Sequence, residues 1–230
     1  MKIIGLQKLT LLDYPGKVAC TVFTEGCNFR CPFCQNSKLV LPNHQAQSIS
    51  SESVLQFLKK RKGLLDGICI SGGEPLIHPE IYDFILQVKT LDYAVKIDTN
   101  GSYPSRLKEL VQHHLIDYIA MDIKSSPERY CMAAGTTENP ITQIEESVNF
   151  IMQCNIPYEF RTTVVKELHT AEEFAAIGHW LKKAKAYYLQ GFVDSEQVLQ
   201  QGLHAYTKEE MEGFLDIIRT YIPNTFIRGL

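Results

Sequence analysis

Three cysteines in one short segment have the type and spacing of a metal site. Cys27, Cys31 and Cys34 are separated by three and then two residues, directly after the apolar run 18–24. Thiolates are soft ligands that suit zinc or an iron–sulfur cluster, and a [4Fe–4S] cluster normally takes four of them. Three ligands from one loop would leave one metal position open, as in catalytic sites that bind substrate there. The alternatives are a zinc site that lacks its fourth ligand, or thiols that are close by chance.

A second motif, Ser71–Pro75, follows the apolar run 67–70 with the sequence SGGEP. Two adjacent glycines let the backbone approach a ligand without a Cβ in the way, and Glu74 adds an anionic acceptor. A Gly-Gly pair before a charged residue is also ordinary turn chemistry. The position of SGGEP downstream of the cysteine motif favours a ligand-binding segment over an ordinary turn.

Taken together, the two motifs resemble those of the radical S-adenosylmethionine (SAM) superfamily, in which an aromatic residue, here Phe33, precedes the third cysteine. Three further segments narrow the resemblance, namely 13–16 (DYPG), 98–101 (DTNG) and 121–124 (MDIK). They are similar to segments of the activating enzymes of glycyl radical enzymes. The nearest subgroup is that of the anaerobic ribonucleoside-triphosphate reductase activating proteins, which are related to pyruvate formate-lyase activating enzymes. The resemblance covers residues 13–165 and extends into the C-terminal part, so it includes most of the chain.

The resemblance implies a role for each motif. The three cysteines would hold a [4Fe–4S] cluster and would be the catalytic metal ligands. Segment 72–74 would bind the methionyl amino group of SAM, Phe33 would lie along the adenine, and Lys124 would pair with the SAM carboxylate. Asp98 and Asp122 would lie near SAM and help to hold a monovalent cation. The implied cofactor-binding residues are Phe33, Gln35, Gly72, Gly73, Glu74, Asp98, Asn100, Asp122, Lys124 and Arg161.

Structural readings of the same residues stay open. Charged side chains at strand ends also serve to solvate them, the Asn100-Gly101 pair is a common turn, and Phe33 fits a core position. Arg161 lies within an apolar run, where a charge is costly unless it is paired, so a buried ion pair is the alternative to a SAM contact. The chain departs from the family pattern at the segment expected near the SAM ribose. Pyruvate formate-lyase activating enzymes have a histidine there, after the sixth strand, whereas this chain has Gln190.

Strand-like and helix-like patterns alternate about six times, and every motif follows a strand. This order predicts parallel βαβ units with right-handed crossovers, whose strand ends build the active site in α/β barrels. A doubly wound open sheet predicts much the same pattern, whereas the resemblance implies an incomplete (β/α)6 TIM-like barrel in a single α/β domain. The expected strands are 18–24, 67–71, 93–98, 117–123, 158–165 and 186–192, with a short final edge at 225–228.

The expected helices lie between these strands. Residues 51–62 show apolar residues at helical spacing, Pro79 and Pro104 each precede a helix, and a further helix runs from Asn139-Pro140 toward Cys154. Thr170 with Glu173, and Thr207 with Glu210, predict capping boxes at the starts of the last two helices. Residues 1–17 are expected to be a lead-in that ends in a turn, residues 18–230 to be the partial barrel, and residues 39–48 to be an irregular connection broken by Pro42 and Asn43.

Composition excludes several classes of function. The chain has 230 residues, 45% of them hydrophobic, and a formal net charge of −3, which disfavours nucleic-acid binding. No apolar run reaches the roughly 18 residues of a membrane span, and the N-terminal residues lack the pattern of a signal peptide. A cytoplasmic protein is therefore expected.

The other cysteines and the histidines carry less information. Seven cysteines at uneven spacing do not predict a disulfide framework. Cys20, Cys69 and Cys154 lie in apolar patterns, and we expect them in the core, whereas Cys131 lies in a polar connection. The histidines, including His169, fit surface or capping positions.

The activity implied by the resemblance is that of an oxidoreductase. An external one-electron reductant, such as flavodoxin or ferredoxin, would drive reductive cleavage of SAM to a 5′-deoxyadenosyl radical, which would abstract hydrogen from a glycine of the partner enzyme. One alternative is a small-molecule radical SAM enzyme similar to the 7-carboxy-7-deazaguanine synthases. The other is a non-catalytic zinc or electron-transfer module.

Overall fold

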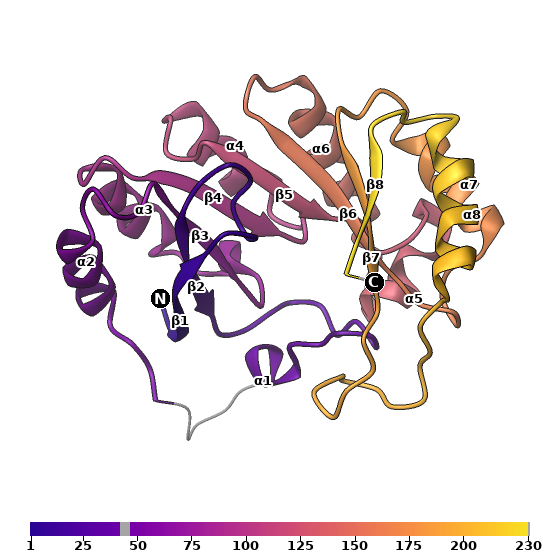
Figure 1. The fold of residues 1–230 in the computed structure, drawn as a ribbon, viewed down its shortest axis with the longest axis horizontal. Coiled ribbons are helices and arrows are strands. Elements are labelled where there is room, and N and C mark those ends of the chain that lie inside the picture. The colour runs from indigo at the N-terminus through magenta and orange to yellow at the C-terminus, as the bar shows by residue number, and fades with distance from the viewer. Residues whose placement is uncertain (42–46, 230) are drawn as a thin grey trace. The chain divides into compact units, whose positions relative to one another are not determined.

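The computed structural model describes residues 1–41 and 47–229. Among these residues the strands form one sheet in chain order, from β1 to β8 (Figure 1). The strands are β1 (Ile3–Thr10), β2 (Ala19–Thr24), β3 (Gly67–Gly72), β4 (Ala94–Thr99), β5 (Tyr118–Asp122), β6 (Tyr158–Val164), β7 (Tyr187–Gly191) and β8 (Thr225–Arg228). The α-helices are α1 (Ser37–Val40), α2 (Ser51–Lys60), α3 (Ile81–Lys89), α4 (Pro104–Gln112), α5 (Tyr130–Ala134), α6 (Ile141–Gln153), α7 (Ala171–Trp180) and α8 (Lys208–Arg219).

The described residues fall into two compact units, and the first comprises residues 1–28, 38–99 and 103–119. Its strands β2, β3 and β4 are parallel, and β1 pairs with β2 in the antiparallel sense. Each parallel step is joined by a helix, α2 or α3, whose apolar residues recur at helical spacing (Figure 1). This is the predicted βαβ arrangement, because a parallel pair needs a crossover connection.

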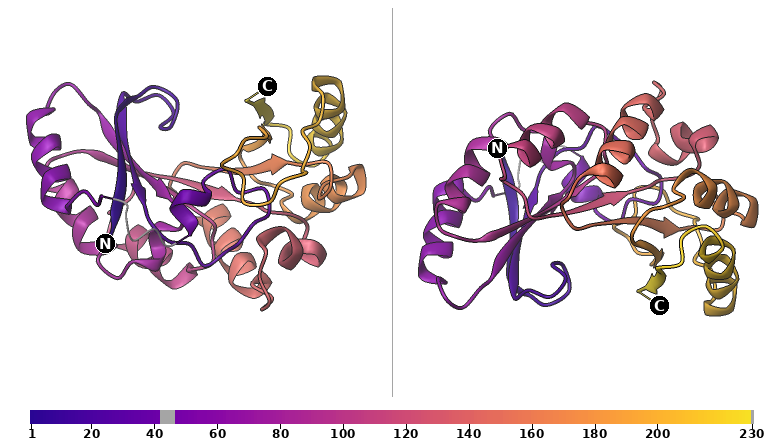
Figure 2. Two further views of the ribbon diagram at one scale, coloured as in Figure 1. Left: turned by 90° about the horizontal axis from the view of Figure 1, so that it is seen from below. Right: turned by 90° about the horizontal axis from the view of Figure 1, so that it is seen from above.

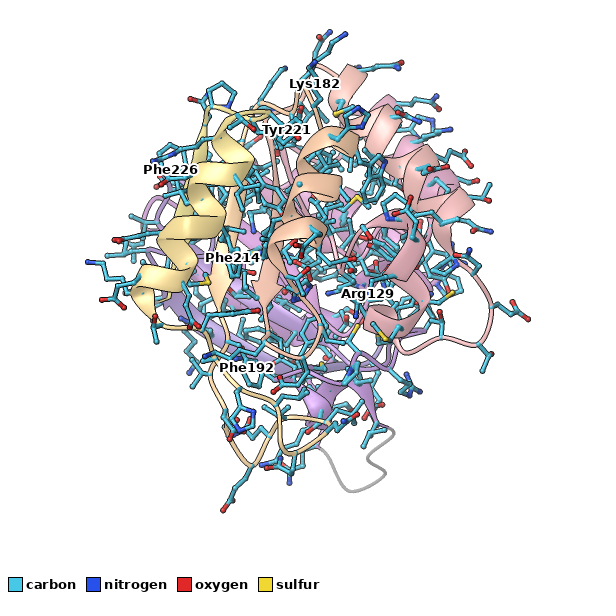
Figure 3. All side chains as sticks on the ribbon, turned by 90° about the vertical axis from the view of Figure 1, so that its right-hand side faces the viewer. Arg129, Lys182, Phe192, Phe214, Tyr221 and Phe226 are labelled. Carbon is cyan, nitrogen blue, oxygen red and sulfur yellow. The ribbon has the colours of Figure 1, made fainter. Side chains whose placement is uncertain are left out.

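The second unit comprises residues 29–37, 100–102 and 120–230. Strands β6, β7 and β8 are parallel, and α7 and α8 lie side by side in all three ribbon views (Figure 1, Figure 2). Figure 3 labels Phe214 and Tyr221, which pack α8 and the residues after it onto α7. The ring centroids of Phe214 and Phe174 are 4.7 Å apart. A Cβ on Gly178 would lie 2.6 Å from the Tyr221 ring, so this helix contact depends on glycine.

The α/β class and the predicted strands are confirmed, with boundaries that differ by one or two residues. Strand β1 was not predicted. Its sequence does not alternate cleanly, its middle residues are partly or fully exposed, and its pairing with β2 is interrupted by register shifts, so the period-2 signal of a half-buried strand is weak. Helix α1 overlaps the start of the expected irregular connection 39–48, and Pro42 and Asn43 lie outside the described residues.

The two predicted capping boxes have different outcomes. At α8 the box is complete, since the Thr207 hydroxyl accepts from the Glu210 backbone and the Glu210 carboxylate accepts from the Thr207 backbone. At α7 Thr170 caps the helix, but the Glu173 carboxylate accepts instead from the Ser125 hydroxyl (2.5 Å) and the Ser126 backbone (3.3 Å). Glu173 is buried, and a tertiary partner has replaced the local one.

The cysteine predictions are confirmed at two positions and wrong at one. Cys20 and Cys69 are fully buried, and burial raises the pKa of the Cys20 thiol to about 12, which suits an inert core residue. Cys154 is only half-buried because it lies at the end of α6. Cys131 is half-buried as well, and all seven cysteines are free thiols. Within residues 1–41 and 47–229, no helix combines the length and the apolar character that a membrane crossing requires.

An ion pair in the second unit joins β6 to β8. The guanidinium of Arg228 donates to both carboxylate oxygens of Glu159, at 2.8 and 3.0 Å, and lies over the Tyr188 ring, 3.4 Å from its centroid. Glu159 is 1% exposed, so its charge depends on this bidentate partner.

We therefore expect Arg228→Met to lower the stability of the protein by about 3 kcal/mol, or about 6–12 °C in Tm. The substitution removes the guanidinium that donates to both oxygens of the buried Glu159 carboxylate. The matched control is Lys208→Met, which removes an exposed pair with Glu212 at 3.8 Å and should change stability by no more than about 0.5 kcal/mol. Thermal unfolding measures both, and equal effects would contradict the assignment.

Candidate functional site

In the first unit, backbone hydrogen bonds hold the SGGEP segment against the start of the cysteine loop. Gly73 donates to the Thr24 carbonyl (3.0 Å) and Glu74 donates to the Gly26 carbonyl (2.8 Å). A Cβ on Gly73 would lie only 1.9 Å from the Gly26 carbonyl oxygen, and Gly72 has a φ of +125°. Both glycines are therefore required by the close approach of two backbones, and this approach places the segment beside the loop that carries the first predicted ligand, Cys27.

Glu74 is fully buried, and its carboxylate serves the loop itself. Its Oε1 accepts from the Leu76 backbone (3.0 Å) and from the Thr99 hydroxyl (2.9 Å). These bonds fix the turn after β3 to the end of β4. The role of the segment in binding the methionyl amino group stays a prediction.

Asp98, at the end of β4, has a partner that the sequence analysis missed. The Lys96 ammonium pairs with one Asp98 carboxylate oxygen, and the Ser71 hydroxyl donates to the other (2.9 Å). Lys96 is 1% exposed. A lysine two residues before an aspartate in a strand was the available signal, because such residues share a face of the sheet.

In the second unit, backbone hydrogen bonds fix the loop that carries the other two predicted ligands. Cys31 is buried, with its Sγ 3.7 Å from the Ala134 carbonyl of α5. The Cys34 carbonyl accepts from the Leu199 backbone (3.0 Å). The Gln35 side chain donates to a carbonyl of the same β7–α8 connection (3.0 Å). Gln35 therefore has a structural contact in addition to its predicted SAM role.

Phe33 is buried in the second unit. Its ring meets the His169 ring edge-on, with centroids 6.2 Å apart, and the Lys124 ammonium lies 5.9 Å from its centroid. The core reading of Phe33 is therefore supported by its contacts, and the adenine contact stays a prediction.

Asp122 at the end of β5, Lys124 just after it and Arg161 in the middle of β6 form a charged triad. Asp122 accepts from Arg161 Nε at 2.5 Å and from Lys124 Nζ at 3.0 Å. Burial opposes the negative charge of Asp122, but Arg161 and Lys124 outweigh it and hold the pKa of Asp122 below its usual range. Asp122 in turn holds the pKa of Lys124 above its usual range, again against burial. All three groups are charged, and the triad has a net charge of +1.

His169 is buried rather than at the surface, which corrects the expectation from sequence. Its Nδ1 accepts from the Val165 backbone (3.0 Å), and its Nε2 lies 2.9 Å from the Lys124 carbonyl, to which it must donate. The ring is therefore neutral, and burial lowers its pKa. A single histidine in a polar connection gave no sequence signal for these distant partners.

Asn100 takes the turn role that was the structural alternative. Its Oδ1 accepts from the Ser102 backbone (2.9 Å) and hydroxyl (2.6 Å), and Gly101 has a φ of +79°. This positive φ favours glycine in the turn, and the Met121 side chain lies close beside it.

The structure thus brings together two groups of the predicted residues. Segment 72–74 and Asp98 lie in the first unit with Cys27, whereas Cys31, Cys34, Phe33 and the triad lie in the second. Among the described residues, no group of three His, Cys, Asp or Glu side chains has an arrangement that could hold a metal ion. The three-cysteine ligand set therefore stays a prediction from the sequence. The chemistry of the donors fits an iron–sulfur cluster, since all three are free thiols.

Residues 21–181, most of the chain, match the family model described as the radical SAM superfamily. A candidate glycyl-radical enzyme activating enzyme of Methanocaldococcus jannaschii is 29% identical over 99% of this chain and 96% of its own length. The pyruvate formate-lyase-activating enzyme of Clostridium pasteurianum is 30% identical over 54% of this chain and 52% of its own. A 7-carboxy-7-deazaguanine synthase of Methanothermobacter thermautotrophicus is 29% identical over 51% of this chain and 46% of its own length.

Solved structures agree on the fold. The crystal structure of Streptococcus suis SuiB bound to S-adenosylmethionine superposes with a TM-score of 0.71 and 14% identity, covering 90% of this chain. This chain spans about half the length of that protein (49%). At this identity the likeness shows the fold alone.

The neutral, buried His169 predicts a pH-dependent stability. Below about pH 6.5 the unfolded chain binds a proton at this histidine, whereas the folded protein resists it. Stability is therefore complete above pH 6.5 and falls as the pH drops toward the lowered folded pKa, by up to about 1.4 kcal/mol per pH unit. His169→Gln should be less stable at pH 7.5 and should lose less stability between pH 7.5 and 5.5.

Thermal unfolding across this range checks the prediction. The control is His114→Asn at an exposed position with a φ of +55°, which asparagine tolerates and which should retain the wild-type pH profile. A His169→Gln profile parallel to that of the wild type would contradict the prediction.

Proposed function

This chain belongs to the radical SAM superfamily, and we propose that within it the protein is an oxidoreductase that activates a glycyl radical enzyme. The observation that carries the proposal is the match to the Methanocaldococcus jannaschii relative, which extends over nearly the whole length of both chains. The matches to the pyruvate formate-lyase-activating enzyme and to the deazaguanine synthase cover about half of this chain. Full-length similarity therefore favours the activating enzyme over the small-molecule enzyme.

The proposed cluster ligands are Cys27, Cys31 and Cys34. When bound, a [4Fe–4S] cluster with an open iron supplies one-electron reductive cleavage of SAM to methionine and a 5′-deoxyadenosyl radical. The chain contributes the three thiolates and the backbone contacts that fix the two halves of the loop. Gly73 and Gly135 keep those contacts short, because a Cβ at these positions would lie only 1.9 and 2.0 Å, respectively, from a carbonyl oxygen.

We propose that the charged triad binds the SAM carboxylate. Asp122 neutralises one of its two cations and orients both, and the net positive charge that results suits an anionic group. Two backbone anchors just after β5 support this role. Thr162 donates to the Ile123 carbonyl (2.7 Å) and His169 to the Lys124 carbonyl (2.9 Å), so Lys124 is held at a fixed position.

The proposed substrate is a glycine in the protein partner, most specifically in anaerobic ribonucleoside-triphosphate reductase. The DYPG and MDIK segments support this choice over a small molecule. In the structure Tyr14 of DYPG is buried, packs against Gly67 and Tyr118, and so has a structural role in the first unit. The proposed electron donor is flavodoxin or ferredoxin.

Cys31→Ala tests the cluster. Anaerobically reconstituted wild-type protein should bind iron and sulfide and, with dithionite, cleave SAM to 5′-deoxyadenosine, whereas the variant should show no cleavage above background. Cys154→Ala, which alters a cysteine outside the predicted ligand set, is the control and should retain activity. Persistent cleavage by Cys31→Ala, or a colourless protein that binds only zinc, would overturn the proposed chemistry.

Lys124→Met tests the carboxylate site. The variant should raise the Kd for SAM by at least about tenfold, because the lost charge-assisted bond contributes about 1.4 kcal/mol or more. Lys166→Met, at an exposed pair with Glu210 (3.1 Å), is the control. Equal SAM affinities in the three proteins, measured by equilibrium dialysis, would remove Lys124 from the site.

The partner assignment needs its own experiment. The activated protein and anaerobic ribonucleoside-triphosphate reductase deuterated at glycine should give deuterated 5′-deoxyadenosine and a glycyl radical signal by electron paramagnetic resonance. Deuterium transfer from a labelled pterin instead would favour the deazaguanine-synthase-like alternative. SAM cleavage with neither transfer would exclude this reductase as the substrate.

A further inference from the structure

Four polar side chains form a compact cluster on one face of the β3–β4 pair. Cys69 and Lys96 are register partners across the two strands. Ser71 and Asp98 lie two residues further along, on the same face. The Lys96 ammonium pairs with the Asp98 carboxylate and lies 3.7 Å from Cys69 Sγ, while the Ser71 hydroxyl donates to the second carboxylate oxygen (2.9 Å). Every member of this cluster lies in the first unit.

The cluster buries a full positive charge. Lys96 is 1% exposed and the Asp98 side chain is 13% exposed. An ammonium group is a compact charge with three donors, and here it lies against a carboxylate and a thiol. Removing one partner of such a buried pair is strongly destabilising, because the other charge keeps its desolvation cost.

The Lys96 ammonium would compete with a bound alkali ion, because both would take a carboxylate oxygen of Asp98. Hard cations take carboxylate, hydroxyl and carbonyl oxygens as ligands, and Asp98 with Ser71 offers such a set. The resemblance described above led us to expect a monovalent cation near Asp98 and Asp122. Asp98 has Lys96 as its counter-ion, and in the second unit Asp122 has Arg161 and Lys124. The residues present do not fit that expectation.

We propose that Lys96 is an internal counter-ion, which keeps Asp98 ionised and in place so that the protein needs no alkali cation there. Lys96 is a positioning residue, since it acts through Asp98. The inference goes beyond the proposed function and holds for any reaction that the site performs.

The wild-type protein provides the first test. The full-length protein, as purified, is unfolded thermally in NaCl, KCl or tetramethylammonium chloride at one ionic strength. The expected Tm values agree within about 1 °C, which corresponds to less than about 0.5 kcal/mol. A saturable rise of Tm with Na⁺ or K⁺ would reveal a bound ion and would overturn the proposal.

Lys96→Met provides the second test. In tetramethylammonium chloride the Tm should fall by about 6–12 °C, and Na⁺ or K⁺ should restore part of the loss by binding at Asp98. The matched control, Lys89→Met, removes a half-exposed pair with Asp117 at 2.8 Å and should stay insensitive to the cation. A folded Lys96→Met protein with the wild-type insensitivity would also overturn the proposal.

A double variant separates charge from packing. Lys96→Met with Asp98→Asn removes both charges, so it should be more stable than Lys96→Met alone and insensitive to the cation, even where the single variant does not fold. A double variant no more stable than the single one would show that Lys96 acts through packing and would overturn the proposal. These readouts do not require SAM cleavage, so a failure of the proposed function would leave them unchanged.

Discussion

The interaction on which both units depend is the pairing of a poorly exposed carboxylate with a cation or a set of hydrogen-bond donors from a neighbouring segment. A carboxylate removed from water is costly unless donors replace the lost hydration. In four places, within or next to strands, side chains of the same chain supply donors to such a carboxylate. The pairs are Glu74 with Thr99, Asp98 with Lys96 and Ser71, Asp122 with Lys124 and Arg161, and Glu159 with Arg228.

Strand register makes these pairings possible, and they in turn penalise any other register. A shift of one residue would turn each side chain to the opposite face of its strand. In the first unit such a shift would separate Lys96 from Cys69 and would move Asp98 away from Ser71. The glycines add a second restraint, because the approach of Gly73 to the Gly26 carbonyl tolerates no side chain. Electrostatics and backbone sterics therefore favour the same alignment of β3 with the segments beside it.

The sequence predicts those features of the fold that are determined locally. Buried parallel strands read as apolar runs, and the Thr207–Glu210 box is formed by residues three apart, so these predictions hold. Features set by distant partners could not be predicted in the same way. Glu173 leaves its helix cap for Ser125, His169 is enclosed by Lys124, Val165 and Phe33, and β1 depends on β2 for its pairing.

The candidate site shows the same division. The motifs could be found because their residue types and spacing are unusual, but their internal contacts were not visible. Asn100 and Gly101 form a turn, Phe33 contacts core residues, and Glu74 serves its own loop. The spacing of Lys96 and Asp98 was the one signal for their pairing, but the cross-strand neighbours Cys69 and Ser71 become known only from the register of β3 and β4. The motif residues therefore combine structural and predicted ligand roles.

A lysine in place of a bound ion has a physical consequence for the site. A free cation must be ordered whenever it binds, and its occupancy follows its concentration. A tethered ammonium loses most of its conformational entropy when the chain folds, so the charge at Asp98 is fixed before any ligand arrives. The Lys96–Asp98 pair is neutral, whereas the triad around Asp122 retains a net charge of +1. The net charge of the triad suits the anionic group that we propose it binds, and the neutral pair contributes rigidity to its own unit.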